Sequence, residues 1–348
     1  GQFAQYHAQA RRALKLATAR GERPAPVHYG ITMKAASAKV DAAYAAFVEK
    51  KMKQIKNGVI ILDDVQQKEA NKYGAKQSGT HYKNLVTGDA LRTQWSYGGA
   101  KYAWKPAAKR PEMPPVSSDV VILPANHKFI IDVGNGLPDS GTMRVRIRAA
   151  RASSEGDHLP TVRLYFGNQP SNDSRISANV GSRDLIIDAP PGSPRFYHWD
   201  VPLTEIPRNA FRKTHKLGQL PNPAEFLDFR NTSSTPVALV IDYVEIIAPV
   251  LNEWPPQSHT RIFHERKGAD DKTYAREVIT RFMSRAWRRS VSDSEVDQKL
   301  ALYGKLCPQC EDFQEAMVEV LASVISSPNF CLILIFDLKK NFLLIKFL

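Results

Sequence analysis

Two cysteines near the carboxyl end stand at a spacing that can support chemistry. In Cys307-Pro-Gln-Cys310 the two thiols could share a metal ion or form a redox disulfide. Haem attachment would need a histidine at the next position, where this chain has Glu311, and a zinc site would need a second ligand pair that the sequence lacks. We therefore favour a pair in a loop that is incidental to function and could close a disulfide.

Four aromatic residues around Gly98-Gly99 form the first candidate binding surface. They are Trp95, Tyr97, Tyr102 and Trp104. Flat rings of this kind can stack on sugar rings with a large contact area and a small loss of conformational entropy. Half-buried aromatic residues are also common in β-sandwiches, so core packing at a strand or turn is the alternative that we favour.

A second candidate surface lies on and after a predicted strand. Its residues are Tyr165, Asn168, Asn172 and Arg175. Loops that a rigid sheet holds in place commonly carry binding groups. A glycan site is therefore one interpretation of these residues, and a solvated turn is the other.

No catalytic signature ties the remaining titratable residues together. None of the nine histidines lies in a His-Glu-x-x-His motif, and His198 is interpreted as a strand residue rather than a base. Four acidic residues could bind calcium or form a glycosidase pair, but sequence does not reveal the distance between carboxylates, and we assign no pair. These acids are Asp132, Asp200, Asp242 and Glu245.

Three arginines alternate with aliphatic residues between positions 142 and 149. Arg144, Arg146 and Arg148 would share one face of a strand while the aliphatic side chains point to the core. Such a row could grip an anionic polymer, although a solvated strand face is the interpretation that we favour.

Length and composition indicate a folded chain with more than one domain. The 348 residues correspond to roughly two domains. Hydrophobic residues at 43% and charged residues at 24% argue against a disordered or collagen-like chain. The net charge of +13 favours polyanions, and residues 1–60 contribute +8 of it from 11 basic and 3 acidic residues. No recognition motif accompanies this charge, so we expect no nucleic-acid partner.

Hydrophobic periodicity divides the chain into helical ends and a β-rich middle. Apolar residues recur at helical spacing over residues 2–18 and 37–56. After Gly58, short alternating runs broken by turn residues predict antiparallel strands, among them 143–149, 162–166, 196–201 and a central strand over 236–247. Helical stripes return at 274–286, 296–303 and 313–324, where Ser292-Asp-Ser-Glu295 fits a capping box.

Several stretches resemble planctomycete-type multidomain proteins that combine a cytochrome-c-like domain with domains of unknown function. Residues 3–14 resemble the helix that closes the first of those domains. Residues 137–148 and 238–246 resemble the central β-domain, whose final strand is similar to those of carbohydrate-binding jelly rolls. Residues 281–296, followed by Ser327-Pro-Asn-Phe330, resemble the helical domain after it. Ser290 stands where the family would have proline, and its corresponding loop usually lacks the Cys307 and Cys310 pair.

The expected fold class is an α+β multidomain chain in which helical segments flank a central antiparallel, jelly-roll-like β-sandwich. We expect a basic helical segment over 1–58, a carbohydrate-binding-like sandwich over 59–252, a linker over 253–269 and a small three-helix domain over 270–330. The tail over 331–348 is almost wholly Leu, Ile, Phe, Lys and Asn, which suggests an out-of-frame end. Its apolar runs are shorter than the ~20 residues that span a bilayer, so we expect no membrane span.

The resemblance implies a secreted or periplasmic protein of which this chain is an internal fragment. Any haem c would belong to family domains that lie outside this sequence, and we expect no cofactor in the chain itself. We predict a noncatalytic carbohydrate-binding-like and scaffold segment, whose partners are a polysaccharide or glycan and the missing domains. The alternative is the scaffold of a periplasmic, cytochrome-linked redox or polysaccharide-degrading enzyme whose catalytic groups lie elsewhere.

Overall fold

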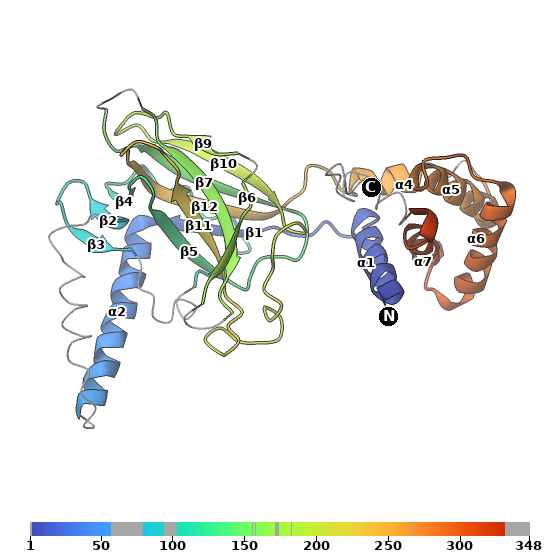
Figure 1. Ribbon diagram of the computed structural model, residues 1–348, viewed down its shortest axis with the longest axis horizontal. Coiled ribbons are helices and arrows are strands. Elements are labelled where there is room, and N and C mark those ends of the chain that lie inside the picture. Colours follow the sequence, from blue (N-terminus) through green and yellow to red (C-terminus); the bar gives the residue numbers. More distant parts are fainter. Residues whose placement is uncertain are drawn as a thin grey trace. The chain divides into compact units, whose positions relative to one another are not determined.

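The computed structural model describes residues 2–56, 79–93, 103–154, 156, 158–170, 174–181, 183–266 and 268–330. The chain divides into two compact units. The β unit is the continuous stretch Ala25–Val250, and the helical unit combines Gly1–Pro24 with Leu251–Leu348. The sequence therefore starts in the helical unit, runs through the whole β unit and then returns to the helical unit (Figure 1).

The β unit is a sandwich of two antiparallel sheets, as the alternating runs predict. Within the described residues, the larger sheet has the order β10-β6-β12-β4-β2-β3 with β1 also on β12, and the smaller has the order β5-β11-β7-β8 with β9 also on β7. The larger sheet contains β1 (Val27–Thr32), β2 (His81–Asn84), β3 (Ala90–Arg92), β4 (Asp119–Leu123), β6 (Thr142–Arg151), β10 (Arg195–Pro202) and β12 (Leu239–Val250). The smaller contains β5 (Lys128–Gly134), β7 (Thr161–Asn168), β8 (Ile176–Asn179), β9 (Leu185–Ile186) and β11 (Glu225–Asn231).

The core lies between the two sheets and is built by period-two alternation. Val145 and Ile147 of β6 and Leu164 of β7 are fully buried. The residues next to them along each strand point outward. Across the sandwich, the ring centroids of Trp199 in β10 and Phe229 in β11 lie 6.0 Å apart. Burial of these apolar faces supplies the main driving force for the sandwich.

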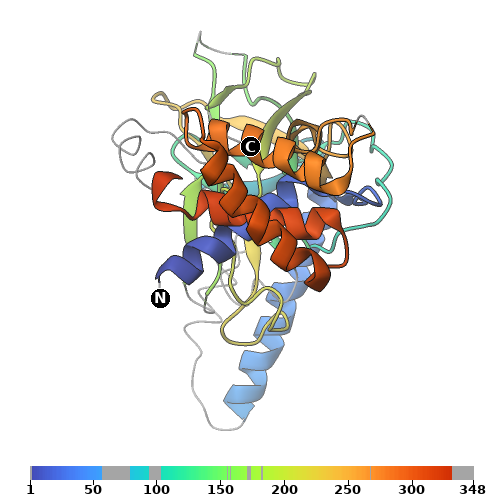
Figure 2. The ribbon, with the colours of Figure 1, turned by 90° about the vertical axis from the view of Figure 1, so that its right-hand side faces the viewer.

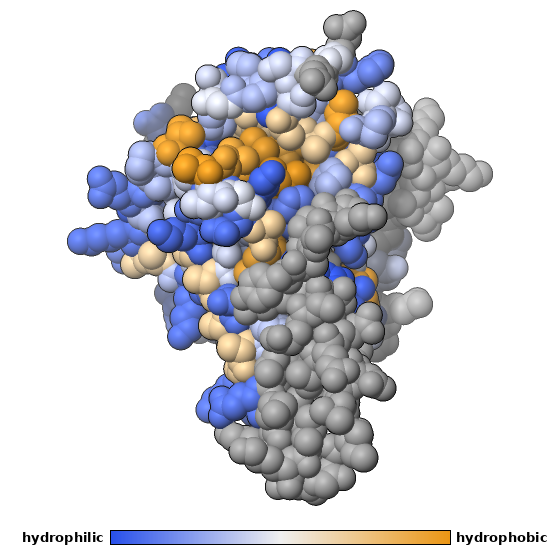
Figure 3. All heavy atoms as spheres, turned by 90° about the vertical axis from the view of Figure 1, so that its left-hand side faces the viewer, coloured by the Kyte–Doolittle hydropathy of each residue, from blue (hydrophilic) through white to orange (hydrophobic). Residues whose placement is uncertain are grey.

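The structure corrects the expected basic helical segment over residues 1–58. This stretch contains β1, which pairs antiparallel with β12 from Val27↔Ala248 to Thr32↔Tyr243. The following helix α2 (Met33–Lys56) buries Met33 and Val40 in the sandwich core, so both elements belong to the β unit. On the side of this unit seen in Figure 3, the described surface is largely hydrophilic and includes an apolar patch.

The helical unit contains the predicted C-terminal helices and further elements. Its members are α1 (Gln2–Ala17), α4 (Gln257–Ile262), α5 (Asp271–Ala286), α6 (Asp293–Leu306), the 3₁₀ turn η2 (Cys307–Gln309) and α7 (Phe313–Ile325). The predicted capping box of α6 is confirmed, because Ser292 Oγ accepts from the Glu295 amide and the Glu295 carboxylate accepts from the Ser292 amide. The expected linker over 253–269 contains α4, whose Ile262 is buried in the helical core.

The amino-terminal helix α1 packs against α7 within the helical unit (Figure 2). Leu14 is fully buried there, Arg11 forms an ion pair with Glu319, and His7 Nδ1 lies 3.2 Å from Ser326 Oγ. The boundaries expected from sequence separated these two ends, whereas the structure joins them in one core. Residues 331–348 lie outside the described part of the chain. No helix in the described part is both long and apolar enough to cross a membrane.

Candidate functional site

The outer face of the larger sheet carries the predicted arginine row, and every arginine in it is paired. Strand β6 lies between β10 and β12, and both neighbours place carboxylates beside the row. The pairs are Arg144–Asp200 at 2.7 Å, Arg146–Glu245 at 2.8 Å and Arg148–Asp242 at 2.6 Å. The pairs neutralise the charge of the row, which argues against its binding an anionic polymer. The solvated strand face that we favoured is wrong for Arg148, whose side chain is only 7% exposed, but Arg144 stays 35% exposed.

Residues 110–115, which form neither helix nor strand, cover part of this face and add hydrogen-bond partners to the pairs. Arg110 donates to both carboxylate oxygens of the fully buried Glu245, at 2.7 and 3.1 Å. Arg148 donates to the carbonyl oxygens of Pro114 and Pro115, each at 2.8 Å. This coverage explains why β12 is buried on both faces, as its apolar run predicts. The acids Asp242 and Glu245 therefore serve structure and are not open to a ligand.

The outer face of the smaller sheet has a different composition. Because Leu227 and Phe229 point to the core, their neighbours on β11 point outward, and the register places Phe226 opposite Asp132 and Asp228 opposite Tyr165. Arg175 precedes β8 at the same end of the sheet. We call this surface the Asp–Arg face; it consists of Asp132, Tyr165, Arg175, Phe226, Asp228 and Arg230.

Two buried carboxylate oxygens on the Asp–Arg face accept no hydrogen bond from the described residues. Asp228 Oδ2 accepts from Arg230 Nε at 3.0 Å and Nη2 at 2.7 Å, but its Oδ1 has no donor. Arg175 Nη2 lies 3.4 Å from both Asp132 oxygens and donates to Oδ2 only, so Asp132 Oδ1 also has no donor. A buried acceptor without a donor costs about 1–3 kcal/mol, which a donor from a ligand would recover.

Burial raises the pKa of Asp132 above its usual value of 3.8, and the nearby Arg175 guanidinium opposes part of this effect. Desolvation penalises the carboxylate because the 3.4 Å contact with Arg175 compensates only partly for the lost water. A hydroxyl that donates to Asp132 would favour the carboxylate. The site is therefore poised to gain a hydrogen-bond donor.

Aromatic rings and guanidinium groups form the rest of the face. The Arg230 guanidinium carbon lies 3.7 Å from the Tyr165 ring centroid, and that of Arg175 lies 5.2 Å from the Phe226 centroid. Gly167 leaves room for the Phe226 ring, because a Cβ at this position would lie 2.6 Å from it. The face thus offers carboxylate acceptors, guanidinium donors and a half-buried tyrosine side by side.

The structure brings together some of the residues singled out from sequence and separates others. Tyr165 and Arg175 both belong to the Asp–Arg face, whereas Asn168 lies on the opposite face of β7 by strand alternation. The Trp104 ring packs against the sandwich core with Lys39 Nζ 3.5 Å from its centroid, and the Trp104 backbone amide donates to the carbonyl oxygen of Asp132 at 2.9 Å. The other candidates lie outside the described residues; they are Trp95, Tyr97, Tyr102 and Asn172.

Sequence reasoning did not single out Asp228 and Arg230 and considered Asp132 only as one of four acids. A signal was present in Phe226-Leu-Asp-Phe-Arg230, where apolar core positions alternate with an aromatic, an acid and a base. This run is the β11 strand, and reading it with period two places its polar residues on one face.

Cys307 and Cys310 of the helical unit are free thiols. Cys307 Sγ lies 3.6 Å from the Tyr303 hydroxyl, and burial raises the pKa of the Cys310 thiol, which keeps it protonated. Within the described part of the chain, no group of three His, Cys, Asp or Glu side chains could hold a metal ion.

Comparisons with known proteins give one family match and several distant structural ones. Residues 274–333 match PSD5, described as a protein of unknown function (DUF1595), which agrees with the unknown-function domain expected in the C-terminal helices. No curated protein matches the chain.

The similar solved structures include carbohydrate-binding modules. The CBM22-1 xylan-binding domain from Paenibacillus barcinonensis Xyn10C shares 5% identity over 40% of this chain and 79% of that chain, with a TM-score of 0.26. The CBM36-1 domain of a multidomain xylanase from the hindgut metagenome of Trinervitermes trinervoides shares 18% identity over 36% and 75%, with a TM-score of 0.23. TM-scores this low do not relate the chain to the ligands of these proteins.

Proposed function

We propose that the β unit is a noncatalytic polysaccharide-binding module that holds a sugar on the Asp–Arg face. The observation that carries this proposal is the pair of buried, outward-facing carboxylate oxygens of Asp132 and Asp228 that lack a donor. Their neighbours Arg175 and Arg230 supply guanidinium donors on the same surface.

A neutral sugar fits this arrangement better than a polyanion. Sugar hydroxyls donate to carboxylates and accept from guanidinium groups, so one ring can satisfy both kinds of group at once. Tyr165 offers an aromatic edge for contact with the ring carbons. A phosphate or uronate, in contrast, would meet Asp132 and Asp228 and be repelled by them.

The helical unit would then serve as the scaffold that joins this module to other parts of a longer protein. Export from the cytoplasm, and haem-bearing domains outside this sequence, stay predictions from the family resemblance. The free-thiol pair and the paired arginine row support no separate activity.

Titration calorimetry of the full chain against xylan, a neutral mannan and an acidic pectate tests the proposal. We expect saturable binding of a neutral polysaccharide that Arg175→Ala and Tyr165→Ala each weaken by about tenfold, the loss expected for a charge-assisted hydrogen bond or a stacking contact. His198→Ala is the matched control, because His198 is an exposed outward residue of the other sheet.

Circular dichroism and thermal unfolding of each variant would show that the fold is retained. Binding that both variants leave unchanged would move the site away from the Asp–Arg face. No binding by the folded chain to any of the polysaccharides would overturn the proposal, as would release of reducing sugar, since a noncatalytic module does not cleave its ligand.

A further inference from the structure

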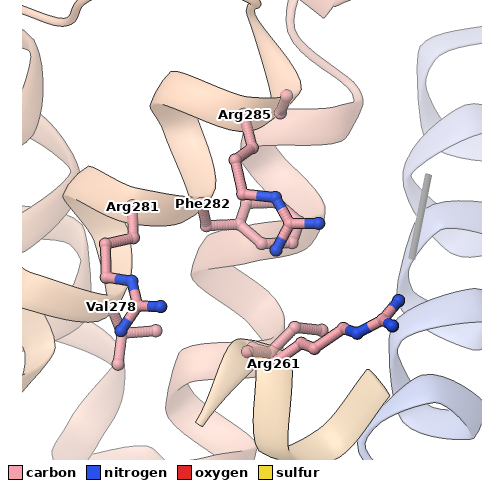
Figure 4. A pocket seen from close by; sticks show the side chains of 7 residues that line it. Arg261, Val278, Arg281, Phe282 and Arg285 are labelled. Atoms are coloured by element: carbon pink, nitrogen blue, oxygen red, sulfur yellow. The ribbon is translucent and has the colours of Figure 1, made fainter. Parts of the chain in front are cut away.

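A pocket of the helical unit lies between α4 and α5, and Figure 4 shows the side chains that line it. Its arginines, Arg261, Arg281 and Arg285, are exposed, and the guanidinium groups of Arg261 and Arg281 point apart. The pocket therefore does not gather its charged groups around one ligand. In the β unit, by contrast, several backbone donors and acceptors point outward together along one edge of the larger sheet.

Strand β10 forms this edge. It pairs with β6 on one side, and no described strand pairs with its other side. All eight residues of β10 are in register with β6, from Arg195↔Ala149 to Pro202↔Thr142, without a bulge. A regular edge strand of this length presents a row of backbone groups to which a further strand can bond.

The register identifies the backbone groups of β10 that are not bonded to β6. Directly after the strand, the Leu203 amide donates to the carbonyl oxygen of Gly141 at 2.9 Å. Because bonded and non-bonded pairs alternate along antiparallel strands, the odd-numbered residues of β10 bond to β6. The N–H and C=O groups of Phe196, His198 and Asp200 therefore point to the free side, where no described residue bonds to them.

The other edges in the described part of the chain are short or occupied. Strand β3 has three residues, β8 has four and β9 has two. Ala107 exchanges two backbone hydrogen bonds with His28 of β1, and the Trp104 amide donates to the Asp132 carbonyl oxygen of β5. Strand β10 also lacks two common protections of an edge strand, a bulge and a lysine, and its proline is its last residue. It is therefore the edge most open to a further strand.

We propose that β10 pairs antiparallel with β10 of a second copy of this chain, around a two-fold axis at Trp199. A two-fold axis makes the interface self-complementary, because each copy supplies the same edge. In this register His198 lies opposite the partner's Asp200, and the symmetry makes this contact twice. The residues that point their backbone groups outward then face one another, as a β-ladder requires.

The side chains of the edge favour this register. His198 and Asp200 are exposed on the outer face of the sheet. Each Asp200 oxygen accepts one hydrogen bond from Arg144, at 2.7 Å, and has capacity for a second from a cross-strand imidazole N–H. A two-fold axis at His198 would instead place the two His198 side chains opposite each other. Cross-strand pairs that attract each other stabilise a sheet, whereas like charges destabilise it.

The dimer goes beyond the proposed polysaccharide binding and does not rest on it. The β10 edge belongs to the larger sheet, and the Asp–Arg face belongs to the smaller one. Weakening the dimer should therefore leave the affinity of each sugar site unchanged, so either proposal can fail without the other.

Sedimentation velocity of the full chain over a wide range of protein concentration tests the dimer. We expect a reversible equilibrium between monomer and dimer. His198→Asp places an acid opposite the partner's Asp200 in both symmetric contacts and should weaken dimerisation by about tenfold. His158→Asp is the matched control, because His158 is an exposed histidine in the segment before β7 and lies outside the edge.

A complementary variant tests the register. Asp200→Lys alone should also weaken dimerisation, because it removes the carboxylate that faces the partner's His198. An equimolar mixture of His198→Asp and Asp200→Lys should restore dimerisation, since the new acid of one copy then faces the new base of the other. Circular dichroism shows whether each variant is folded, and restored dimerisation in the mixture would itself show that both edges are intact.

Amide hydrogen exchange locates the contact. On dimerisation the amides of His198 and Asp200 should become protected, while the Trp199 amide, which bonds to β6, is protected in the monomer as well. The proposal is overturned if the chain stays monomeric, if His158→Asp weakens dimerisation as much as His198→Asp, or if the mixture stays monomeric. Association that grows beyond a dimer would also overturn it, since a two-fold axis closes the pair.

Discussion

The two outer faces of the sandwich both carry arginine and aspartate, but they differ in how completely these groups are paired. On the larger sheet, Arg148 and Asp242 form a buried pair, and the carbonyl oxygens of Pro114 and Pro115 accept further hydrogen bonds from the Arg148 guanidinium. On the smaller sheet, Asp132 and Asp228 are as deeply buried but each keeps an oxygen without a donor. A charged strand face therefore indicates a binding site only where partners are missing, and the mere presence of arginine and aspartate does not.

The largest expected effect is on the closed face. Arg148→Met would leave Asp242 buried and unpaired, and we expect a loss of about 3–5 kcal/mol in the free energy of unfolding of the β unit. Urea denaturation, together with hydrogen exchange of the β12 amides, would measure it. The control Arg144→Met breaks an exposed pair and should cost at most about 1 kcal/mol. Equal effects of the two substitutions would contradict the distinction between buried and exposed pairs.

A moderate effect is expected at the open face. In Gly167→Ala the new methyl group would overlap the Ile176 carbonyl oxygen and crowd the Phe226 ring. We expect a loss of about 1–3 kcal/mol and weaker polysaccharide binding, because β8 and Arg175 would have to shift. The matched control is Gly88→Ala, at a turn where a Cβ meets no neighbouring atom but φ is +80°, so it should lower stability without changing affinity. Affinity unchanged by Gly167→Ala would separate the binding site from this part of the sheet.

The smallest expected effect is on the pH dependence of stability, which should have opposite signs for Asp132 on one face and Asp200 on the other. Burial raises the pKa of Asp132 above 3.8, so wild type should lose stability relative to Asp132→Asn as pH rises from below 3.8 through the raised pKa. The Arg144 guanidinium lowers the pKa of Asp200, so wild type should exceed Asp200→Asn in stability above pH 3.8 and lose that advantage as pH falls through the lowered pKa. Because Asp200 is well exposed, its effect should stay below about 1 kcal/mol.

Urea denaturation of wild type and both variants between about pH 3 and pH 7 would test these signs. A difference that changes in the same direction for both variants would show that the two carboxyl groups do not lie in contrasting environments.

Much of the fold follows from local patterns. Alternation locates β6, β7 and β10, and the capping box locates the start of α6, because these signals depend on residues a few positions apart. The short strand β1 was missed because its six residues lie between two helical patterns and gain their stability from β12, more than two hundred residues later. For the same reason, the domain boundaries expected from sequence placed α1 and its partner α7 in different domains.

The candidate site was less predictable than the strands around it. Tyr165 and Arg175 could be selected because they lie on and after a strand whose alternating apolar and polar residues are evident in the sequence. The unpaired state of Asp228 could not, since Asp228 and Asp242 look alike in sequence and differ only in whether a distant arginine reaches both carboxylate oxygens. Hydrogen bonding to distant side chains decides which acid keeps an oxygen without a donor, and no local sequence pattern reveals it.

The return of the chain to the helical unit has a consequence for synthesis on the ribosome. Helix α1 emerges before the β unit, yet its contact between His7 and Ser326 joins residues 319 positions apart. The β unit is a continuous stretch and can fold as soon as β12 has emerged, while α1 must wait with its apolar stripe uncovered until α7 follows. During that interval α1 is the segment most in need of protection by a chaperone, and a nascent chain arrested just after β12 should present it.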